Sequence, residues 1–411
     1  MFRIMVSVIL FITLCVSTAD PVQAARYRAR ECGITFNTAA SGVGTNNAIT
    51  DVPGVLVGHV DVHDFVGKTY FTGVTAIVPH GGNVFQDKVP GAFFRGNGFG
   101  KMAGGTQIME LGNIETPIVL TNTLSIAAGL RGVIDHTLAQ TGNEGVTSVN
   151  AVVGETNDNS LGQIRTARVT REHVMEAIQN AKGGPVEEGS IGAGSGTSTF
   201  SAKGGIGTAS RRVTISNVVY HVGALVQTNF GGTLTIDGMR VGNSLLEPTP
   251  VPNPATEEIL SPGLNPDDGS CMIVIATDAP VCSRNLERLA KRAFTALGRT
   301  GSSYSNGSGD YIIAFSTAPA IRIPHNSNIL DGGIQLDRVI YNDSMGGLFT
   351  AVVGATEEAI INSLFAATTV QRLNTSGTVA STTRAIDIPR VLDRMVELGY
   401  QGIIRPWLIQ E

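Results

Sequence analysis

Residues 267–278 constrain the fold of this chain more than any other stretch. The polar, turn-forming residues 267–269 change abruptly to an apolar, β-branched run at 273–275, and a second turn follows at 278–280. This pattern predicts a buried strand bounded by turns. Ser270 is then expected where an exposed peptide meets the first residue of a core strand.

The junction between Gly269 and Ser270 suits a self-cleaving peptide bond. Glycine allows backbone conformations that are closed to other residues, and the hydroxyl of Ser270 can attack the Gly269 carbonyl. An N-to-O acyl shift followed by hydrolysis would leave Ser270 as a new N-terminus. Its hydroxyl would be a nucleophile and its α-amine, with an ordinary pKa of about 7.7–8.0, a general base. The alternative is a plain loop-to-strand junction with a capping serine, which is a common pattern.

The composition changes sharply just before this junction. Residues 243–269 hold six prolines, which cannot be accommodated in a helix or a central strand. The stretch is also acidic, so it is predicted to be an exposed connector. A cut at its end would release Ser270 without disturbing the core.

Hydrophobic periodicity predicts alternating groups of strands and helices. Strands are expected within 47–59 and at 72–79, 118–121, 146–153, 212–220, 222–227 and 311–316. Helices are expected at 124–138, from Thr170 as N-cap, at 283–297 between a Ser283 cap and a Gly298 stop, at 356–368 and at 389–398. Strands that precede helices twice over favour an α+β sandwich of two helix-covered sheets.

Five motifs, taken in order, resemble one family of enzymes. They are the turn and strand at 47–59, then 154–158, Asn229-Phe230-Gly231, Asp268-Gly269-Ser270 with its following strand, and 305–310. They are similar to the autoprocessing serine aminopeptidases typified by L-aminopeptidase/D-Ala-esterase/amidase and the β-peptidyl aminopeptidases. The resemblance spans nearly all of residues 45–400. It implies a four-layer αββα sandwich with two internal, mainly antiparallel sheets, similar to N-terminal nucleophile hydrolases, and a homotetramer of αβ units.

The resemblance also implies catalytic roles for residues around Ser270. The amide of Asn229 would donate to the oxyanion, and Ser308 with Asp310 would orient and activate the nucleophile. The family often has glutamate at the position of Asp310. Taken alone, Asn229 is equally explained as a turn asparagine, and the segment around Ser308 as an ordinary hairpin, because Asn-Gly is a strong turn signal.

Three further residues are candidates for substrate binding. Relatives in the family carry a tyrosine where Asn157 stands, and an asparagine amide can also donate a hydrogen bond to an oxyanion. Glu144 and Glu155 are candidates for binding the free amino group of a substrate. A solvated carboxylate is the common alternative for each of them.

The first 24 residues are expected to be a signal peptide. Arg3 is followed by the apolar run 5–16 and by a small-residue cleavage site at 22–24. The apolar run is shorter than the 18 or more residues that a membrane span needs. The mature protein is therefore expected to be a periplasmic or secreted catalytic domain of residues 25–411, cleaved into chains 25–269 and 270–411, with no membrane anchor left.

Charge and metal-ligand patterns exclude other classes of function. The net charge is −5 and the chain has no basic run, which argues against a nucleic-acid partner. Seven scattered histidines and three cysteines beyond the leader form no metal-ligand pattern, so no metal or organic cofactor is expected. Cys271 lies beside Ser270, but strand alternation turns only one of the two toward a site, which favours a buried, inert thiol.

The sequence thus predicts an exported, self-activated serine aminopeptidase. It would hydrolyse an amide or ester next to a free amine in small peptides or amino-acid amides. One alternative is an acyltransferase of the ornithine acetyltransferase type, which uses a threonine nucleophile in a similarly processed fold. The other is a processed secreted binding protein without activity.

Overall fold

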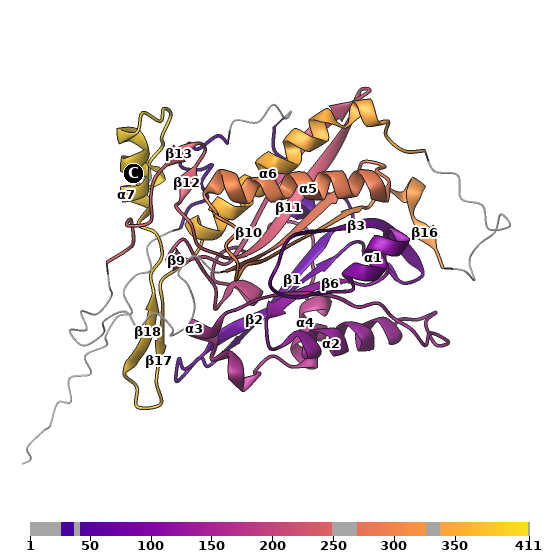
Figure 1. The fold of residues 1–411 in the computed structure, drawn as a ribbon, viewed down its shortest axis with the longest axis horizontal. Helices are drawn as coiled ribbons and strands as arrows, with labels where there is room; N and C mark the ends of the chain where they lie inside the picture. The colour runs from indigo at the N-terminus through magenta and orange to yellow at the C-terminus, as the bar shows by residue number, and fades with distance from the viewer. Residues whose placement is uncertain (1–25, 37–41, 249–268, 326–337, 410–411) are drawn as a thin grey trace, which may run out of the picture.

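Two β-sheets stacked face to face form the centre of the molecule, and helices cover both outer faces (Figure 1). The computed structural model describes residues 26–36, 42–248, 269–325 and 338–409. The predicted leader and most of the proline-rich connector lie outside the described residues. The predicted α+β, αββα sandwich is confirmed.

The first sheet has five strands in the order β1-β2-β6-β7-β4. Its β6 and β7 run parallel, and the other neighbours run antiparallel. The strands are β1 (Leu56–His63), β2 (Phe71–Val78), β4 (Met102–Ala103), β6 (Ile118–Asn122) and β7 (Val152–Thr156).

The second sheet has seven strands, with β10-β11-β14-β15-β3-β16 in order and β5 beside β3. Again one pair, β14 and β15, is parallel. The strands are β3 (Asp87–Gly98), β5 (Asn113–Ile114), β10 (Ile206–Ile215), β11 (Val218–Asn229), β14 (Ser270–Thr277), β15 (Gly309–Ser316) and β16 (Ile323–Pro324). Both sheets are therefore mainly antiparallel, as predicted.

Four helices form the outer layers. α2 (Ile126–Leu138) and α4 (Arg171–Gln179) pack on the first sheet, and α5 (Ser283–Thr300) and α6 (Gly346–Phe365) pack on the second. The glycines of α2 allow the close packing that their presence predicts, because a Cβ at Gly129 would stand 2.6 Å from Val153. The smaller elements are α1 (Gly105–Leu111), α3 (Asn159–Gly162), α7 (Ile388–Glu397), β8 (Ser198–Thr199), β9 (Ala202–Lys203), β12 (Thr235–Ile236), β13 (Met239–Arg240), β17 (Val370–Leu373), β18 (Val379–Thr383) and the 3₁₀ turn η3 (Gly192–Gly194).

α6 is long and apolar enough to cross a membrane by length and composition, but 83% of that stretch is buried inside the fold. It packs on β10, β11 and α5. It is therefore a largely buried helix of the layer that covers the second sheet.

β14 is the buried strand that the abrupt change in polarity predicts. All of its residues are buried. Met272 and Val274 pack between the two sheets, whereas Cys271 and Ile273 face the opposite side, in the cluster that includes α5 and α6. This alternation confirms that Cys271 is buried on the face opposite to that of Met272.

Several predicted boundaries are wrong. Gly298 does not end α5, because it makes room for Tyr304, whose hydroxyl would lie 2.4 Å from a Cβ there. The helix ends instead at Gly301, whose φ of 104° is left-handed, and Cys282, rather than Ser283, is the N-cap. The turn between β10 and β11 falls at 216–217, where both residues have positive φ, so the strand predicted at 212–220 spans a hairpin.

Two other elements differ in extent. α6 begins at Gly346, ten residues before the predicted start, because it is buried nearly all round and lacks the one-sided pattern that marks a helix in sequence. β7 begins at Val152 and ends at Thr156, later than the strand predicted at 146–153. This shift brings Glu155 onto the strand.

Candidate active site

Ser270 is the first residue of β14 and is 7% exposed. In the sheet register it lies between Asn229, the last residue of β11, and Gly309, the first residue of β15. Three neighbouring strands therefore begin or end at one place. The sheet brings Ser270, Asn229, Ser308 and Asp310 together at that edge.

The peptide bond before Ser270 is held by the backbone of β15. The Gly309 N–H donates to the Gly269 carbonyl oxygen at 3.0 Å, and the Ser270 Oγ lies 3.3 Å from the same nitrogen. A Cβ at Gly269 would stand 2.3 Å from the Asn229 carbonyl oxygen and 2.4 Å from the Phe230 Cα. The glycine therefore permits close approach of this peptide to the end of β11.

Ser308 and Asp310 form a buried pair. The Ser308 hydroxyl donates to the Asp310 Oδ2 at 2.8 Å, and neither residue is more than 2% exposed. Burial raises the pKa of Asp310 to about 6, against hydrogen bonds from Ser308 and Cys271 that lower it. Among the described residues, its other oxygen, Oδ1, has no hydrogen-bond partner within the usual distance, and the side chain that holds the carboxylate is that of Ser308.

The neighbouring thiol does not compete with the serine. Burial, with a smaller contribution from the Asp310 charge, raises the pKa of Cys271 well above its usual range. The thiol therefore stays protonated and is a poor nucleophile.

Asn229 is oriented by the first residue of β8. Its Oδ1 accepts the Ser198 N–H at 3.1 Å. The amide nitrogen is then the end that can donate to the space next to Ser270. Behind it, Thr228 bonds to Thr199 at 2.8 Å and to Ser363 of α6 at 2.9 Å, which ties the end of β11 to the core.

The glycine-rich loop at 192–196 is held in place by side chains of the first sheet. Asp61 accepts the Gly192 N–H at 2.6 Å and the Ser195 hydroxyl at 3.1 Å. Thr75 accepts the Ala193 N–H at 3.1 Å and bonds to the His59 Nδ1 at 2.9 Å. These contacts fix η3, and η3 leads directly into the segment that holds Asn229.

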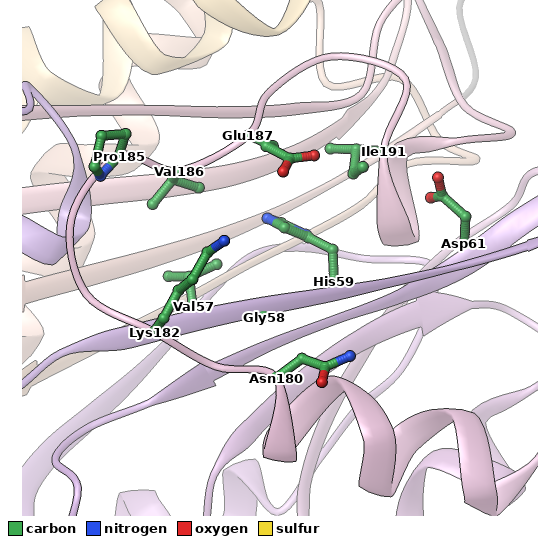
Figure 2. A pocket seen from close by; sticks show the side chains of 10 residues that line it. All are labelled: Val57, Gly58, His59, Asp61, Asn180, Lys182, Pro185, Val186, Glu187 and Ile191. Atoms are coloured by element: carbon green, nitrogen blue, oxygen red, sulfur yellow. The ribbon is translucent and has the colours of Figure 1, made fainter.

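A cavity of about 360 Å³ lies beside η3 and is lined by β1 and by residues 180–191. Figure 2 shows the His59 ring and the Lys182 side chain pointing into it, with Glu187 across the cavity. Burial lowers the pKa of His59 to about 4, so its ring is neutral near pH 7. None of the predicted site residues lines this cavity.

Glu155 lies near the serine group, on β7 of the facing sheet. It is 2% exposed. Its Oε1 accepts the Lys101 N–H at 2.9 Å and pairs with the Lys101 Nζ at 3.1 Å, and its Oε2 accepts a short hydrogen bond from Thr123. A Cβ at Gly100 would lie 3.3 Å from that Oε1 and 3.4 Å from the Gly309 Cα. The carboxylate is thus a close neighbour of β15 at the point where Ser270 pairs with it.

The structure does not bring Glu144 and Asn157 into contact with this group. Glu144 is exposed in the loop after α2, where its carboxylate accepts the Gly142 N–H at 3.1 Å. Asn157 is exposed just after β7, and its Oδ1 accepts the Asn159 N–H at 3.0 Å. Within the described residues, these contacts are local to each loop, and substrate roles for both remain predictions.

Sequence reasoning missed the residues that act through their backbone or from distant loops. Gly309, Ser198 and Lys101 belong to this set, and none carries a recognisable motif. In the described part of the chain, no group of three His, Cys, Asp or Glu side chains could hold a metal ion.

The chain is similar to known aminopeptidases over most of its length. Residues 47–377 match peptidase family S58. The chain is 40% identical over 357 residues to the β-peptidyl aminopeptidase BapA of Sphingosinicella microcystinivorans, covering 84% of this chain and 87% of that protein.

Solved structures give the same result. A β-aminopeptidase from Burkholderia sp. has a TM-score of 0.78 at 33% identity, covering 91% of this chain and 100% of that one. The L-aminopeptidase D-Ala-esterase/amidase of Ochrobactrum anthropi, described as a variant of the Ntn hydrolase fold, has a TM-score of 0.80 at 32% identity, covering 92% and 99%.

Proposed function

The chain belongs to peptidase family S58 and is a serine aminopeptidase, and from that premise we propose that it activates itself by cutting its own chain before Ser270. The observation that carries the proposal is the position of this bond. Its carbonyl accepts the Gly309 N–H, and its serine stands between Asn229 and Gly309 at the edge of the sheet.

Self-cleavage proceeds in two steps, an acyl shift and a hydrolysis. The Ser270 Oγ attacks the Gly269 carbonyl carbon, the C–N bond breaks, and the Ser270 nitrogen takes up the proton that the hydroxyl loses, which leaves an ester between Gly269 and Ser270. Water then hydrolyses the ester to a Gly269 carboxylate and a free Ser270. The Gly309 N–H stabilises the negative charge that develops on the Gly269 oxygen, which it already contacts at 3.0 Å.

Turnover reuses the same group on a substrate. The freed α-amine of Ser270 takes the proton of its own hydroxyl, which attacks the substrate carbonyl. The amide of Asn229 and the Gly309 N–H stabilise the oxyanion, and Asn157 is the further candidate donor. Ser308 and Asp310 position the new N-terminus. The α-amine returns the proton to the leaving amine or alcohol as the substrate bond breaks, and water then hydrolyses the acyl ester on Ser270 and restores the enzyme.

The proposed substrates are small peptides, amino-acid amides or esters that carry a free amine. Glu155 supports this class, because its buried carboxylate is a binding site for an ammonium group close to the reacting bond. β-Aminoacyl amides are the first substrates to test, since the relative from Sphingosinicella microcystinivorans is named a β-peptidyl aminopeptidase. The similarity to aminopeptidases favours hydrolysis over acyl transfer and over a role limited to binding.

The same proposal covers maturation and assembly. Residues 1–24 would direct export to the periplasm or medium. Chains 25–269 and 270–411 would stay associated, because both contribute strands to the second sheet. The assembled protein is proposed to be a homo-oligomer, a tetramer of αβ units.

Intact-mass analysis of the purified protein tests the proposal. The wild type should give two chains, the second starting at Ser270. Ser270→Ala removes one oxygen, so the protein should fold, remain one chain and lose turnover of an aminoacyl p-nitroanilide, because nucleophile and base disappear together. Cys271→Ala is the matched control and should still be cut. A folded Ser270→Ala protein that cuts itself or hydrolyses the anilide would refute the mechanism.

A further inference from the structure

Three groups contact the Glu155 carboxylate, and one of them, the Lys101 ammonium, is on a half-exposed side chain. Two of the carboxylate's hydrogen bonds come from the half-buried Thr123 hydroxyl and from the Lys101 backbone N–H. Its third partner is the Lys101 ammonium at 3.1 Å, on a side chain that is 48% exposed. A buried carboxylate is thus neutralised by a flexible cation that can leave into solvent.

The ammonium of Lys101 lies where a substrate amine is needed. The Glu155 Oε1 and the Gly309 Cα are both within 3.4 Å of one point above Gly100, so the two atoms are less than about 7 Å apart. In an α-amino acid, the amine nitrogen and the carbonyl carbon are separated by two bonds of about 1.5 Å each. One aminoacyl group can therefore contact Glu155 and present its carbonyl beside Gly309 and Ser270.

The loop that carries Lys101 is hydrogen-bonded to residues near Ser270, so its backbone has a fixed position relative to Ser270. The Phe99 N–H donates to the Ser308 carbonyl at 3.1 Å, and the Tyr311 hydroxyl donates to the Gly100 carbonyl at 2.8 Å. Only the side chain of Lys101 extends freely beyond this anchored backbone. It can leave Glu155 without unfolding the loop.

We propose that Lys101 is an internal substitute for the substrate's ammonium group. It occupies Glu155 while the site is empty, and the free amine of a substrate replaces it. This inference rests on the proposed function and deepens it, since it makes Lys101 a residue that sets the affinity for amines. Because one ammonium replaces another, the charge at Glu155 is the same before and after binding.

Lys101→Met removes the competing cation and keeps an unbranched side chain. The Lys101 ammonium is 48% exposed, so solvent screens its pair with Glu155, and loss of the pair should change an equilibrium at most about five-fold. The KM for an aminoacyl p-nitroanilide should therefore fall up to about five-fold while kcat stays the same. Lys101→Arg should keep the wild-type KM approximately. Lys291→Met is the matched control, because Lys291 is also 48% exposed and pairs with a carboxylate, Glu287, on α5; it should change nothing.

The salt dependence of KM distinguishes this role from a purely structural one, because a structural lysine would not change it. In the wild type, ammonium replaces ammonium, so KM should change little when salt rises from about 0.05 to 0.5 M. In Lys101→Met the substrate amine meets an unneutralised carboxylate, so KM should rise with salt. A KM that is unchanged or higher in Lys101→Met, with the salt dependence of the wild type, overturns the inference.

Binding of a short amino alcohol separates this inference from the proposed function. The ligand has an amine but no carbonyl, so calorimetry measures its affinity whether or not the protein turns substrates over. Tighter binding by Lys101→Met than by the wild type supports the exchange even in a protein that fails to hydrolyse the anilide. Equal or weaker binding refutes it even in an active enzyme.

Discussion

Replacing Asp310 by asparagine should make the folded protein more stable near neutral pH while it damages function. Asp310 is fully buried, and burial raises its pKa from 3.8 to about 6. A carboxyl group with a raised pKa in the folded state lowers the stability of that state as pH rises through this window. The difference corresponds to about 3 kcal/mol of unfolding free energy when the group is fully ionised.

The pH dependence follows from the same values. Below about pH 4 the carboxyl group is protonated in the folded state and mostly so in the unfolded state, so its cost is small. The cost grows as pH rises toward about 6 and is constant above about 7. Asparagine cannot ionise, so the variant should gain about 3 kcal/mol at pH 7.5 and less than about 1 kcal/mol at pH 4.

The comparison requires proteins with the same covalent structure. Ser270→Ala and Ser270→Ala/Asp310→Asn are both expected to remain single chains, and denaturant unfolding at pH 4 and pH 7.5 gives the two differences. An equal change at both pH values, or a loss of stability at pH 7.5, would refute a buried carboxylate with a raised pKa.

The functional arm uses the single variant. Asp310→Asn weakens the hydrogen bond from Ser308 by removing its charge, so self-cleavage and anilide turnover should both slow at pH 7.5. The wild type should lose self-cleavage as pH falls through about 6, and the variant should lack this transition. If Asp310→Asn keeps the wild-type rates of both reactions, Asp310 has no role in either and is only a turn residue.

Two further predictions concern other residues. Gly269→Ala should slow self-cleavage at least about ten-fold, because its Cβ would stand 2.3 Å from the Asn229 carbonyl oxygen and the displaced peptide would lose one charge-stabilising contact. Time-resolved intact-mass analysis measures the cleavage rate, and a wild-type rate would contradict this prediction. Glu358→Gln should cost about 3–5 kcal/mol in denaturant unfolding, because the fully buried carboxylate pairs with Arg211 at 2.8 Å and Arg30 at 2.7 Å. The exposed Glu397→Gln is its control, and a similar small effect for both would contradict the burial argument.

The sequence predicts those parts of the fold whose chemistry changes abruptly along the chain. β14 is recognisable because a polar turn becomes an apolar run within a few residues, and its burial on both faces follows from the absence of polar alternation. Strands and helices that alternate in groups favour two helix-covered sheets, and the four-layer αββα order is what the family resemblance implies. The end of α5 was mispredicted because glycine serves packing at Gly298 and termination at Gly301, and sequence alone does not distinguish these uses.

Within the site, side chains with motifs are predictable and backbone groups are not. Ser270, Ser308 and Asp310 stand beside turn residues, so their positions at strand ends can be inferred. Glu144 and Glu155 look equivalent in sequence, and the later end of β7, at Thr156, separates a loop carboxylate from a buried one. Lys101 comes from a loop about 50 residues before Glu155, and no local pattern connects the two.

The proposed function requires two reactions from one geometry, and the parts of the site would divide between them. Self-cleavage needs a nucleophile, a held carbonyl and an oxyanion donor, and Ser270, Gly269 and Gly309 supply these within a single chain. It needs no amine site, because the reacting bond has no free amine. Under the proposed function Glu155 would serve turnover alone, and before the first substrate arrives its buried charge requires another partner. Lys101, from the loop that also contacts Ser308, pairs with Glu155 in this structure, so we propose that the precursor folds around a carboxylate that it does not yet use.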